Sequence, residues 1–267
     1  MINLDRAPER LAFFAAEARK AGLAFERVAA VDGKAMDAGE LEAQMSPDFQ
    51  FQPINAGEAA VFLSHRKCWQ RLVDSGENMA LILEDDAVLA DAIAPVLQAI
   101  GRFEQAFGII RLETTGRRIV VEENHIDIMP GFQAHRQLTW HGGTAGYVID
   151  REAATFLLNQ TARVSDPVDQ AMFHPHSRLF GRLSVHQCVP ACVIQYDILH
   201  EGEDNGTLAS TTGRKAGGYR LFRHGFLNDL RRIWIRHAER RLRRRLAMSA
   251  GNLSISVPFA GSTDKGE

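Results

Sequence analysis

The sequence contains little cysteine and no long apolar run. Its three cysteines, Cys68, Cys188 and Cys192, form no Cys-x-x-Cys pair, and an odd number of thiols cannot all be paired in disulfides within one chain. This usage indicates a reducing compartment. No apolar segment approaches the roughly eighteen residues of a membrane-spanning helix, and no basic stretch followed by an apolar one marks a leader. We therefore expect neither a spanning helix nor a signal peptide.

Three potential metal ligands lie close together near residue 190. His186, Cys188 and Cys192 offer one imidazole and two thiols, which are groups that zinc binds. Their spacing is irregular for a zinc site, and such cysteines more often lie buried as small apolar residues. We therefore expect buried, unpaired cysteines and keep zinc as the alternative.

Strands and helices alternate along the first 200 residues. A short strand over residues 2–4 is followed by a helix over 8–22 and by a second strand over 25–31. Strand, helix, strand is the unit that builds a parallel sheet. A longer helix is expected to open at Asn55 or Gly57 and to run through about Ser75, where Gly76 stops it. Hairpins or a long loop are expected over 113–140. For 267 residues with 45% hydrophobic content, this order predicts an α/β fold with a mostly parallel sheet flanked by helices.

The most distinctive stretch is an apolar strand that ends in three adjacent acids. Residues 79–83 read Met-Ala-Leu-Ile-Leu and are followed by Glu84, Asp85 and Asp86. A continuous apolar strand is typical of the centre of a parallel sheet, and α/β sheets bind ligands at the ends of such strands. A divalent cation offsets the repulsion among the acids. We therefore predict Glu84 and Asp86 as metal ligands, with a solvated acidic turn as the alternative.

Three other stretches carry candidate functional residues, each with a structural alternative. His65 lies on the buried face of the helix over 57–75, where it is either a hydrogen-bonded core residue or, with Ser64, a phosphate contact. The small residues of 142–146 allow a backbone to approach a ligand closely, although many turns carry a glycine pair. Asp169 falls in the first turn of a predicted helix, as a functional acid or as an ordinary helix-start acid.

The C-terminal part is strongly basic. Residues 214–245 hold eleven arginines and one lysine against Asp229 and Glu239. Their net charge is therefore +10, and because the whole chain is −2 the remainder is −12. Apolar residues, Trp234 among them, recur at helical spacing, and a basic amphipathic helix with tryptophan is typical of membrane-surface binding. The alternative is a solvated helix packed on the acidic body, and no nucleic-acid recognition fold accompanies the charge.

Taken in order, these stretches resemble glycosyltransferase family 25, the lipopolysaccharide-biosynthesis glycosyltransferases, many of them β-galactosyltransferases. The resemblance covers roughly residues 2–200, and its specificity comes from the order of the blocks rather than from any single one. The similar blocks are Ile2-Asn3-Leu4-Asp5-Arg6 with Pro8-Glu9-Arg10, residues 25–33, Gly57-Glu58 with Leu63-Ser64-His65, Leu83-Glu84-Asp85-Asp86, Gly143-Thr144-Ala145-Gly146-Tyr147, Pro167-Val168-Asp169 and residues 190–195.

The resemblance implies a GT-A type, Rossmann-like fold, a UDP-sugar donor with UDP-galactose as first candidate, and Mn²⁺ or Mg²⁺. It also implies a place for each site residue along the donor. These are Asn3, Leu4 and Asp32 at the uridine, Arg10 near the phosphates, Ser64 and His65 against the donor, Gly143, Thr144 and Ala145 at the sugar, and Asp86 with Glu84 or Asp85 at the metal.

The chemistry of sugar transfer agrees with these residue types. A metal neutralises the charge that builds on the leaving diphosphate. Inversion needs one carboxylate that takes the proton of the attacking hydroxyl, and we predict Asp169 for this role. The predicted enzyme is an inverting hexosyltransferase that acts on a lipopolysaccharide, lipooligosaccharide or other glycan acceptor.

Two alternatives remain from other classes. A non-catalytic nucleotide-sugar-binding paralogue needs neither metal acids nor a base, and this chain retains both. A metal-dependent nucleotidyltransferase usually spreads its metal carboxylates over several strands, whereas those at 84–86 are consecutive.

The chain divides into three predicted segments. Residues 1–212 form the glycosyltransferase domain, 213–250 a basic helical extension and 251–267 a loose tail. The nucleotide sugar is made in the cytosol and a lipid-linked acceptor lies at the membrane. We therefore predict a cytoplasmic protein, peripheral on the inner face of the membrane through residues 214–246, without a nucleic-acid partner.

Overall fold

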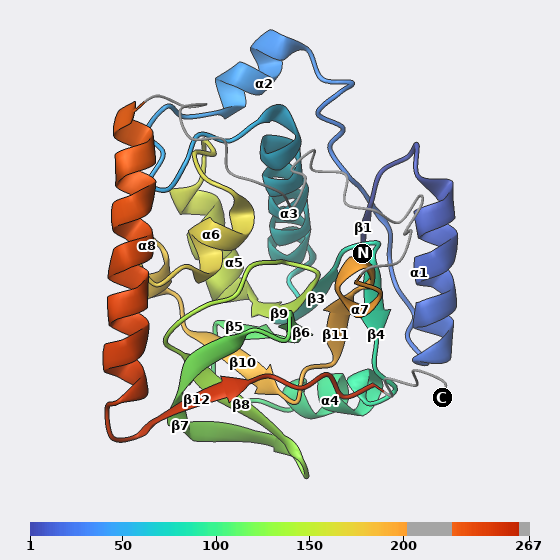
Figure 1. Cartoon of the computed structure of the whole chain (residues 1–267). Coiled ribbons are helices and arrows are strands. Elements are labelled where there is room, and N and C mark those ends of the chain that lie inside the picture. Colours follow the sequence, from blue (N-terminus) through green and yellow to red (C-terminus); the bar gives the residue numbers. More distant parts are fainter. Residues whose placement is uncertain (202–225, 262–267) are drawn as a thin grey trace.

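A seven-stranded sheet runs through the centre of the computed structural model, which describes residues 1–201 and 226–261. Its strand order is β12-β7-β8-β10-β5-β9-β3 (Figure 1). The strands of this sheet are β3 (Met79–Leu83), β5 (Ile109–Arg111), β7 (Arg118–Met129), β8 (Phe132–Gln137), β9 (Gly146–Asp150), β10 (Val185–Val189) and β12 (Asn252–Ser256).

Two small sheets and a set of helices complete the described fold. The small sheets are β1 (Ile2–Asn3) with β2 (Val28–Ala29), and β4 (Ala87–Leu89) with β11 (Val193–Gln195) and β6 (Glu113–Thr114). The helices are α1 (Pro8–Lys20), α2 (Ala38–Gln44), α3 (Ala56–Ser75), α4 (Ile93–Ile100), α5 (Arg151–Gln160), α6 (Val168–Phe173), the 3-10 turn η1 (Phe180–Arg182), α7 (Tyr196–Leu199) and α8 (Phe226–Ala247).

Helices cover both faces of the large sheet, and its central strands send alternate residues to two hydrophobic cores. Ile109 and Ile149 face a core built with α3, α5 and α6. Ile110 and Val148 face a second core built with α1 and α4 (Figure 1). Neighbouring side chains of a strand point to opposite faces, so a continuous apolar strand is needed wherever both faces are covered.

Local signals set the ends of the long helix α3 as predicted. The Asn55 side chain accepts a hydrogen bond from the backbone N–H of Glu58, whose carboxylate accepts one from the N–H of Asn55. This capping box satisfies two N–H groups that have no partner within the helix. Gly76 ends the helix at φ 75°, a left-handed conformation that glycine adopts without steric cost. These signals position the helix that carries Ser64 and His65.

The prediction of a mostly parallel sheet is wrong. In the described seven-stranded sheet only β10 and β5 pair in parallel, and the other five pairings are antiparallel. The strand over residues 79–83 forms as β3, but it lies at the edge of the sheet and runs antiparallel to β9. Among the described strands, the parallel pairs are β1–β2, β10–β5 and β11–β6. Strand–helix–strand order does not determine which strands pair, because pairing joins segments that are distant in sequence.

The C-terminal part differs in one respect from its prediction. Helix α8 forms over Phe226–Ala247, while residues 214–225 of the predicted basic segment lie outside the described residues. Residues 252–256 are not part of a loose tail, since they form β12 and pair with β7. Edge strand β7 offers unpaired backbone groups, which β12 satisfies. Among the described helices, none is long and apolar enough to cross a membrane.

The cysteines lie as expected. Cys68, Cys188 and Cys192 are all buried and unpaired. Among residues 1–201 and 226–261, no group of three or more metal-binding side chains is found, so the described structure offers no support for the zinc alternative near residue 190.

Candidate functional site

A cavity of about 670 Å³ opens where β1, β2, α3 and the acidic turn after β3 meet the start of α6. Twelve of the thirteen predicted site residues line it, although they come from segments up to 166 positions apart. Ala145 is the exception: it is fully buried, and its backbone carbonyl accepts a hydrogen bond from the N–H of Glu84. A single bridge between Ile2 and Glu84 places β1 directly beside the acidic turn.

Asp85 neutralises Arg10 within the cavity wall. Its two carboxylate oxygens accept hydrogen bonds from Arg10 Nε and Asn3 Nδ2, both at 2.7 Å. Arg10 Nη2 also lies 3.1 Å from Asp86 Oδ2. Arg10 is only 6% exposed, so its charge is shielded from solvent and interacts with the adjacent acids. Its predicted place near the phosphates is therefore shared with a structural role that orients Asp85 and Asp86.

Asp86 has an unused oxygen. Its Oδ1 is buried and has no hydrogen-bond partner, although buried polar atoms are nearly always paired. Burial and the neighbouring charge of Glu84 raise the pKa of Asp86 to about 7 despite the opposing charge of Arg10. A carboxylate oxygen without a hydrogen-bond partner beside a cavity fits a divalent cation, which such sites bind through one or two carboxylates plus substrate phosphates. Asp86 Oδ1 could therefore hold Mn²⁺ or Mg²⁺ together with substrate phosphates, while residues 1–201 and 226–261 contain no group of three or more side chains arranged around a metal.

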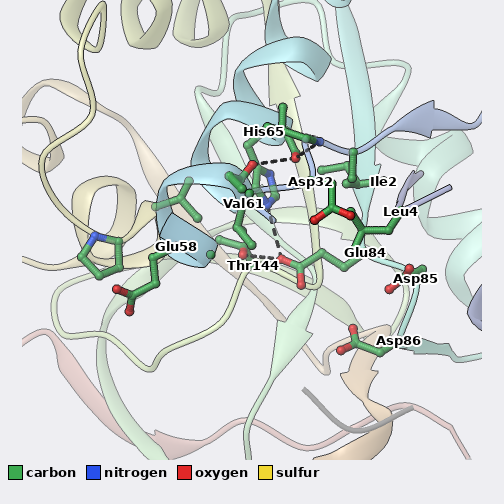
Figure 2. A pocket seen from close by; sticks show the side chains of 18 of the residues that line it. Ile2, Leu4, Asp32, Glu58, Val61, His65, Glu84, Asp85, Asp86 and Thr144 are labelled. Carbon is green, nitrogen blue, oxygen red and sulfur yellow. Dashed lines mark hydrogen bonds and ion pairs between the residues drawn. The ribbon is translucent and has the colours of Figure 1, made fainter. Parts of the chain in front are cut away.

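Glu84 is oriented by a chain of hydrogen bonds from the core. Trp69 Nε1 donates to the Tyr147 hydroxyl at 2.9 Å, and that hydroxyl lies 2.9 Å from His65 Nδ1. His65 Nε2 lies 3.3 Å from Glu84 Oε1, which also accepts from the Thr144 hydroxyl. Figure 2 shows the Glu84 carboxylate turned toward Thr144 and His65, away from Asp86.

The donor and acceptor roles in this series of hydrogen bonds follow from its first donor, Trp69. Because the indole N–H of Trp69 only donates, the Tyr147 hydroxyl is free to donate to His65 Nδ1, which leaves Nε2–H to donate to Glu84. Burial alone would raise the pKa of Glu84, but hydrogen bonds from His65 and Thr144 and the charge of Arg10 lower it. His65 is therefore the hydrogen-bonded core residue of the two alternatives, and it acts on the site through Glu84.

Asp169 lies in the first turn of α6, where backbone N–H groups are unpaired. Its Oδ1 accepts from the N–H of Gln170 at 2.8 Å and its Oδ2 from the N–H of Gly143 at 3.2 Å. Burial raises the pKa of Asp169, and these two hydrogen bonds oppose that effect. A carboxylate with a raised pKa is a stronger base, and each of its oxygens retains a lone pair for a further donor.

The remaining predicted residues lie at the rim and wall of the cavity. The Ser64 hydroxyl donates to the carbonyl of Ala60 at 2.7 Å and accepts from the N–H of Val31 at 2.9 Å. It therefore ties α3 to the chain after β2. Asp32 is partly exposed and accepts from Arg6 Nε at 2.6 Å, while Leu4 lines the opening beside it.

Two functional candidates escaped the sequence analysis. Arg111 and Glu113 are both 0% exposed and lie behind the glycine turn at residues 142–145. Burial lowers the pKa of Arg111 to about 10 and raises that of Glu113 to about 8. The signal was present in the sequence, because Arg-Leu-Glu follows an apolar strand just as the acids at 84–86 do.

The described fold is an α/β protein with a cavity lined by acidic side chains at the end of a strand. A family model described as "Glycosyltransferase family 25 (LPS biosynthesis protein)" matches residues 1–172. The chain belongs to this family and is a glycosyltransferase. All thirteen predicted site residues lie within the matched range.

Individual relatives carry the similarity over most of the chain. The protein is 28% identical to "Lacto-N-neotetraose biosynthesis glycosyltransferase LgtB" of Neisseria meningitidis serogroup A, over 97% of this chain and 98% of the relative. It is 30% identical to the corresponding LgtE of Neisseria gonorrhoeae over 61% and 60% of the two chains. It is 27% identical to "Procollagen galactosyltransferase 1" of Danio rerio, over 66% of this chain and 31% of that one.

Proposed function

We propose that this glycosyltransferase transfers galactose from UDP-galactose to a glycan acceptor of the lipooligosaccharide kind, with inversion and with Mn²⁺ or Mg²⁺, on a GT-A type fold. One observation carries the proposal. The same cavity brings together a buried, unpartnered oxygen of Asp86 and the raised-pKa carboxylate of Asp169, from two different elements. The names of the relatives support the sugar and the acceptor class, since one is a galactosyltransferase and others act in lacto-N-neotetraose biosynthesis.

The acidic turn would hold the diphosphate end of the donor. Asp86, with Glu84 beside it, would bind the divalent cation, which when bound neutralises charge on the leaving diphosphate. Arg10 orients Asp85 and Asp86 through contacts of 2.7 and 3.1 Å, while His65 keeps Glu84 ionised. Asn3, Leu4 and Asp32 lie at the other end of the cavity wall, where the uridine would bind.

Asp169 would activate the acceptor. In the transfer step the acceptor oxygen forms a bond to the anomeric carbon while the bond from that carbon to the phosphate oxygen breaks. The proton of the acceptor hydroxyl passes to a carboxylate oxygen of Asp169, and UDP leaves with the electron pair. The Gly143 and Gln170 N–H groups hold Asp169 in one orientation, which is the positioning that such a transfer requires.

The direct test is to incubate the purified protein with a panel of UDP-sugars and Mn²⁺ and to measure slow hydrolysis of each donor. Hydrolysis of UDP-galactose ahead of the other sugars, and its loss on chelation with EDTA, is the expected result. If none of the UDP-sugars is hydrolysed at any metal concentration, the proposal is refuted. That result would favour the non-catalytic binding paralogue if UDP still bound.

We also propose that α8 holds the enzyme at an anionic membrane surface. The partly buried residues of its described part are Ile235, Ala238, Glu239, Leu242 and Leu246, at the spacing of one helical face. Glu239 attaches this face to the body by accepting hydrogen bonds from Trp140 Nε1, at 3.1 Å, and His174 Nε2.

The remaining surface of the described part of α8 is basic and exposed. Trp234 is 70% exposed. Five arginines are also exposed and form no ion pair within the described residues, namely Arg240, Arg241, Arg243, Arg244 and Arg245. Each such charge near an anionic surface contributes about 1 kcal/mol, screened by salt. Figure 1 shows α8 along one side of the molecule, where a flat surface can reach it.

Cosedimentation with vesicles tests this second proposal. Full-length protein should partition onto anionic vesicles at low salt and be released at high salt, and it should not bind neutral vesicles. A variant ending at Thr212 should lose this binding. If the shortened and full-length proteins partition equally, α8 is a structural helix only.

A further inference from the structure

The turn at residues 142–145 is held from behind by two buried charged side chains that contact neither solvent nor the cavity. Arg111 lies at the end of β5 and Glu113 in β6, and both are 0% exposed. Neither lines the cavity, whereas Gly143 and Thr144 of the turn do. The turn therefore lies between this pair and the proposed donor sugar.

Arg111 binds the carbonyl side of the turn. Its Nη1 donates to the carbonyl of His141 at 3.0 Å, and its Nη2 donates to the carbonyls of Gly142 and Gly143 at 3.2 and 2.9 Å. The guanidinium also lies over the Phe173 ring, 4.1 Å from its centre. Three consecutive carbonyls thus point toward one cation, so the turn has little freedom to rotate.

Glu113 binds the amide side of the same turn. Its Oε2 accepts from the N–H of Ala145 at 2.9 Å, and its Oε1 is buried without a hydrogen-bond partner. The carboxyl packs directly on Gly143, where a Cβ atom would lie 2.2 Å from Oε1. Gly143 also has φ +96°, which other residues rarely adopt. A buried oxygen without a hydrogen-bond partner lowers the stability of the folded protein. We therefore expect its position against this glycine to serve a function.

The cavity side of the turn carries two hydrogen bonds that this contact would support. The N–H of Gly143 donates to Asp169 Oδ2 at 3.2 Å, and the Thr144 hydroxyl donates to Glu84. We propose that Glu113, supported by Arg111, is a positioning residue. Its carboxyl reaches the N–H of Ala145 and thereby fixes the direction of the Gly143 N–H. The Gly143 N–H in turn orients Asp169. This inference rests on the proposed function, because it assigns Asp169 the role of base.

Two conservative substitutions separate the length of the side chain from its ability to ionise. Glu113→Gln keeps the length of the side chain and an oxygen for Ala145, but it cannot ionise. Glu113→Asp keeps the carboxyl but withdraws it by one methylene. Because burial raises the pKa of Glu113 to about 8, glutamine also matches the neutral form that the carboxyl adopts at pH 7. Glu123→Gln, at an exposed position of β7, is the matched surface control.

Kinetics and UDP binding give the first readout. Glu113→Asp should lower kcat by roughly 10–100-fold, the usual effect of losing a support behind a functional group. Its affinity for UDP with Mn²⁺ should stay within about twofold, because UDP lacks the sugar. Glu113→Gln and Glu123→Gln should retain kcat within about threefold. The inference is overturned if Glu113→Gln is as damaging as Glu113→Asp, if neither changes kcat, or if UDP affinity falls together with kcat.

The second readout does not depend on activity. The sequence has two Gly-Gly pairs, 142–143 and 217–218, so labelling glycine with carbonyl ¹³C and amide ¹⁵N yields two carbonyl-correlated amide signals. The signal that moves in Asp169→Asn belongs to Gly143. It should shift in Glu113→Asp and stay in place in Glu113→Gln, and an unmoved signal in Glu113→Asp overturns the inference. A wild-type protein that transfers no sugar would instead overturn the proposed function, whatever this signal does.

Discussion

Replacing Asp86 by asparagine tests the electrostatics of the cavity and the proposed metal site together. In the absence of metal, the pKa of Asp86 is about 7 in the folded protein against 3.8 in the reference state. The folded protein therefore binds a proton more tightly than the unfolded chain, so ionisation of Asp86 opposes folding. This cost is small below pH 4, grows as pH rises, and levels off above about pH 7. Asparagine keeps the shape of the side chain and removes the cost.

The magnitude follows from the difference of about three pKa units. At about 1.4 kcal/mol per unit, the asparagine variant should exceed the wild type by up to about 4 kcal/mol in free energy of unfolding at pH 8. At pH 5 the gap should fall to about 2 kcal/mol, because the folded protein still holds its proton there. Urea unfolding at the two pH values measures both gaps. Asp91→Asn, an exposed acid just after β4, should show no such pH-dependent gap.

Adding ligand should narrow the stability gap at pH 8 from about 4 to about 1 kcal/mol. With Mn²⁺ and UDP at about a hundred times their dissociation constant, the wild type should gain about 3 kcal/mol by mass action. The asparagine variant should gain almost nothing, because its oxygen is neutral. Equal gains in the two proteins would refute the assignment of Asp86 to the metal. A stability gap that is the same at pH 5 and pH 8 would refute the electrostatic reasoning.

Three further substitutions test other parts of the site. Asp169→Asn should lower transfer by roughly 10²–10⁴-fold with unchanged UDP binding by calorimetry, and near wild-type turnover would exclude it as the base. His65→Phe removes a hydrogen bond that lowers the pKa of Glu84, so loss of UDP–Mn²⁺ affinity on acidification should begin at a higher pH. An identical pH profile would show that His65 does not act through Glu84. Trp234→Ser should weaken binding to anionic vesicles roughly tenfold with the same salt dependence, and undiminished binding would place Trp234 away from the membrane.

Much of the local structure could be predicted from the sequence because its causes are local. The capping residues Asn55 and Glu58 and the left-handed Gly76 lie within a few positions of the ends of α3. The hairpin of β7 and β8 falls within the stretch at 113–140 that was expected to contain hairpins or a long loop. In each case the interacting groups are neighbours along the chain, so their spacing is readable without a fold.

The residues of the candidate site were also readable, since recognising them depends on residue types in order. Three adjacent acids after an apolar strand, a glycine turn and a helix-start aspartate occur in the order typical of the family. Tertiary structure brought them to one cavity, with only Ala145 left behind its wall.

Only the tertiary structure decided which strands pair and which charges meet. The sheet is mostly antiparallel because β12 pairs with β7, β10 with β8 and β3 with β9 across long sequence separations, and apolar strand residues suit either direction. Arg10 neutralises Asp85 across 75 positions. Arg111 and Glu113 lie fully buried behind Gly143, a burial that their position after an apolar strand does not by itself specify. The sequence shows which chemistry a charged side chain can take part in, but not which residue it will contact. Its partner depends on which backbones the fold brings within a few ångströms of it.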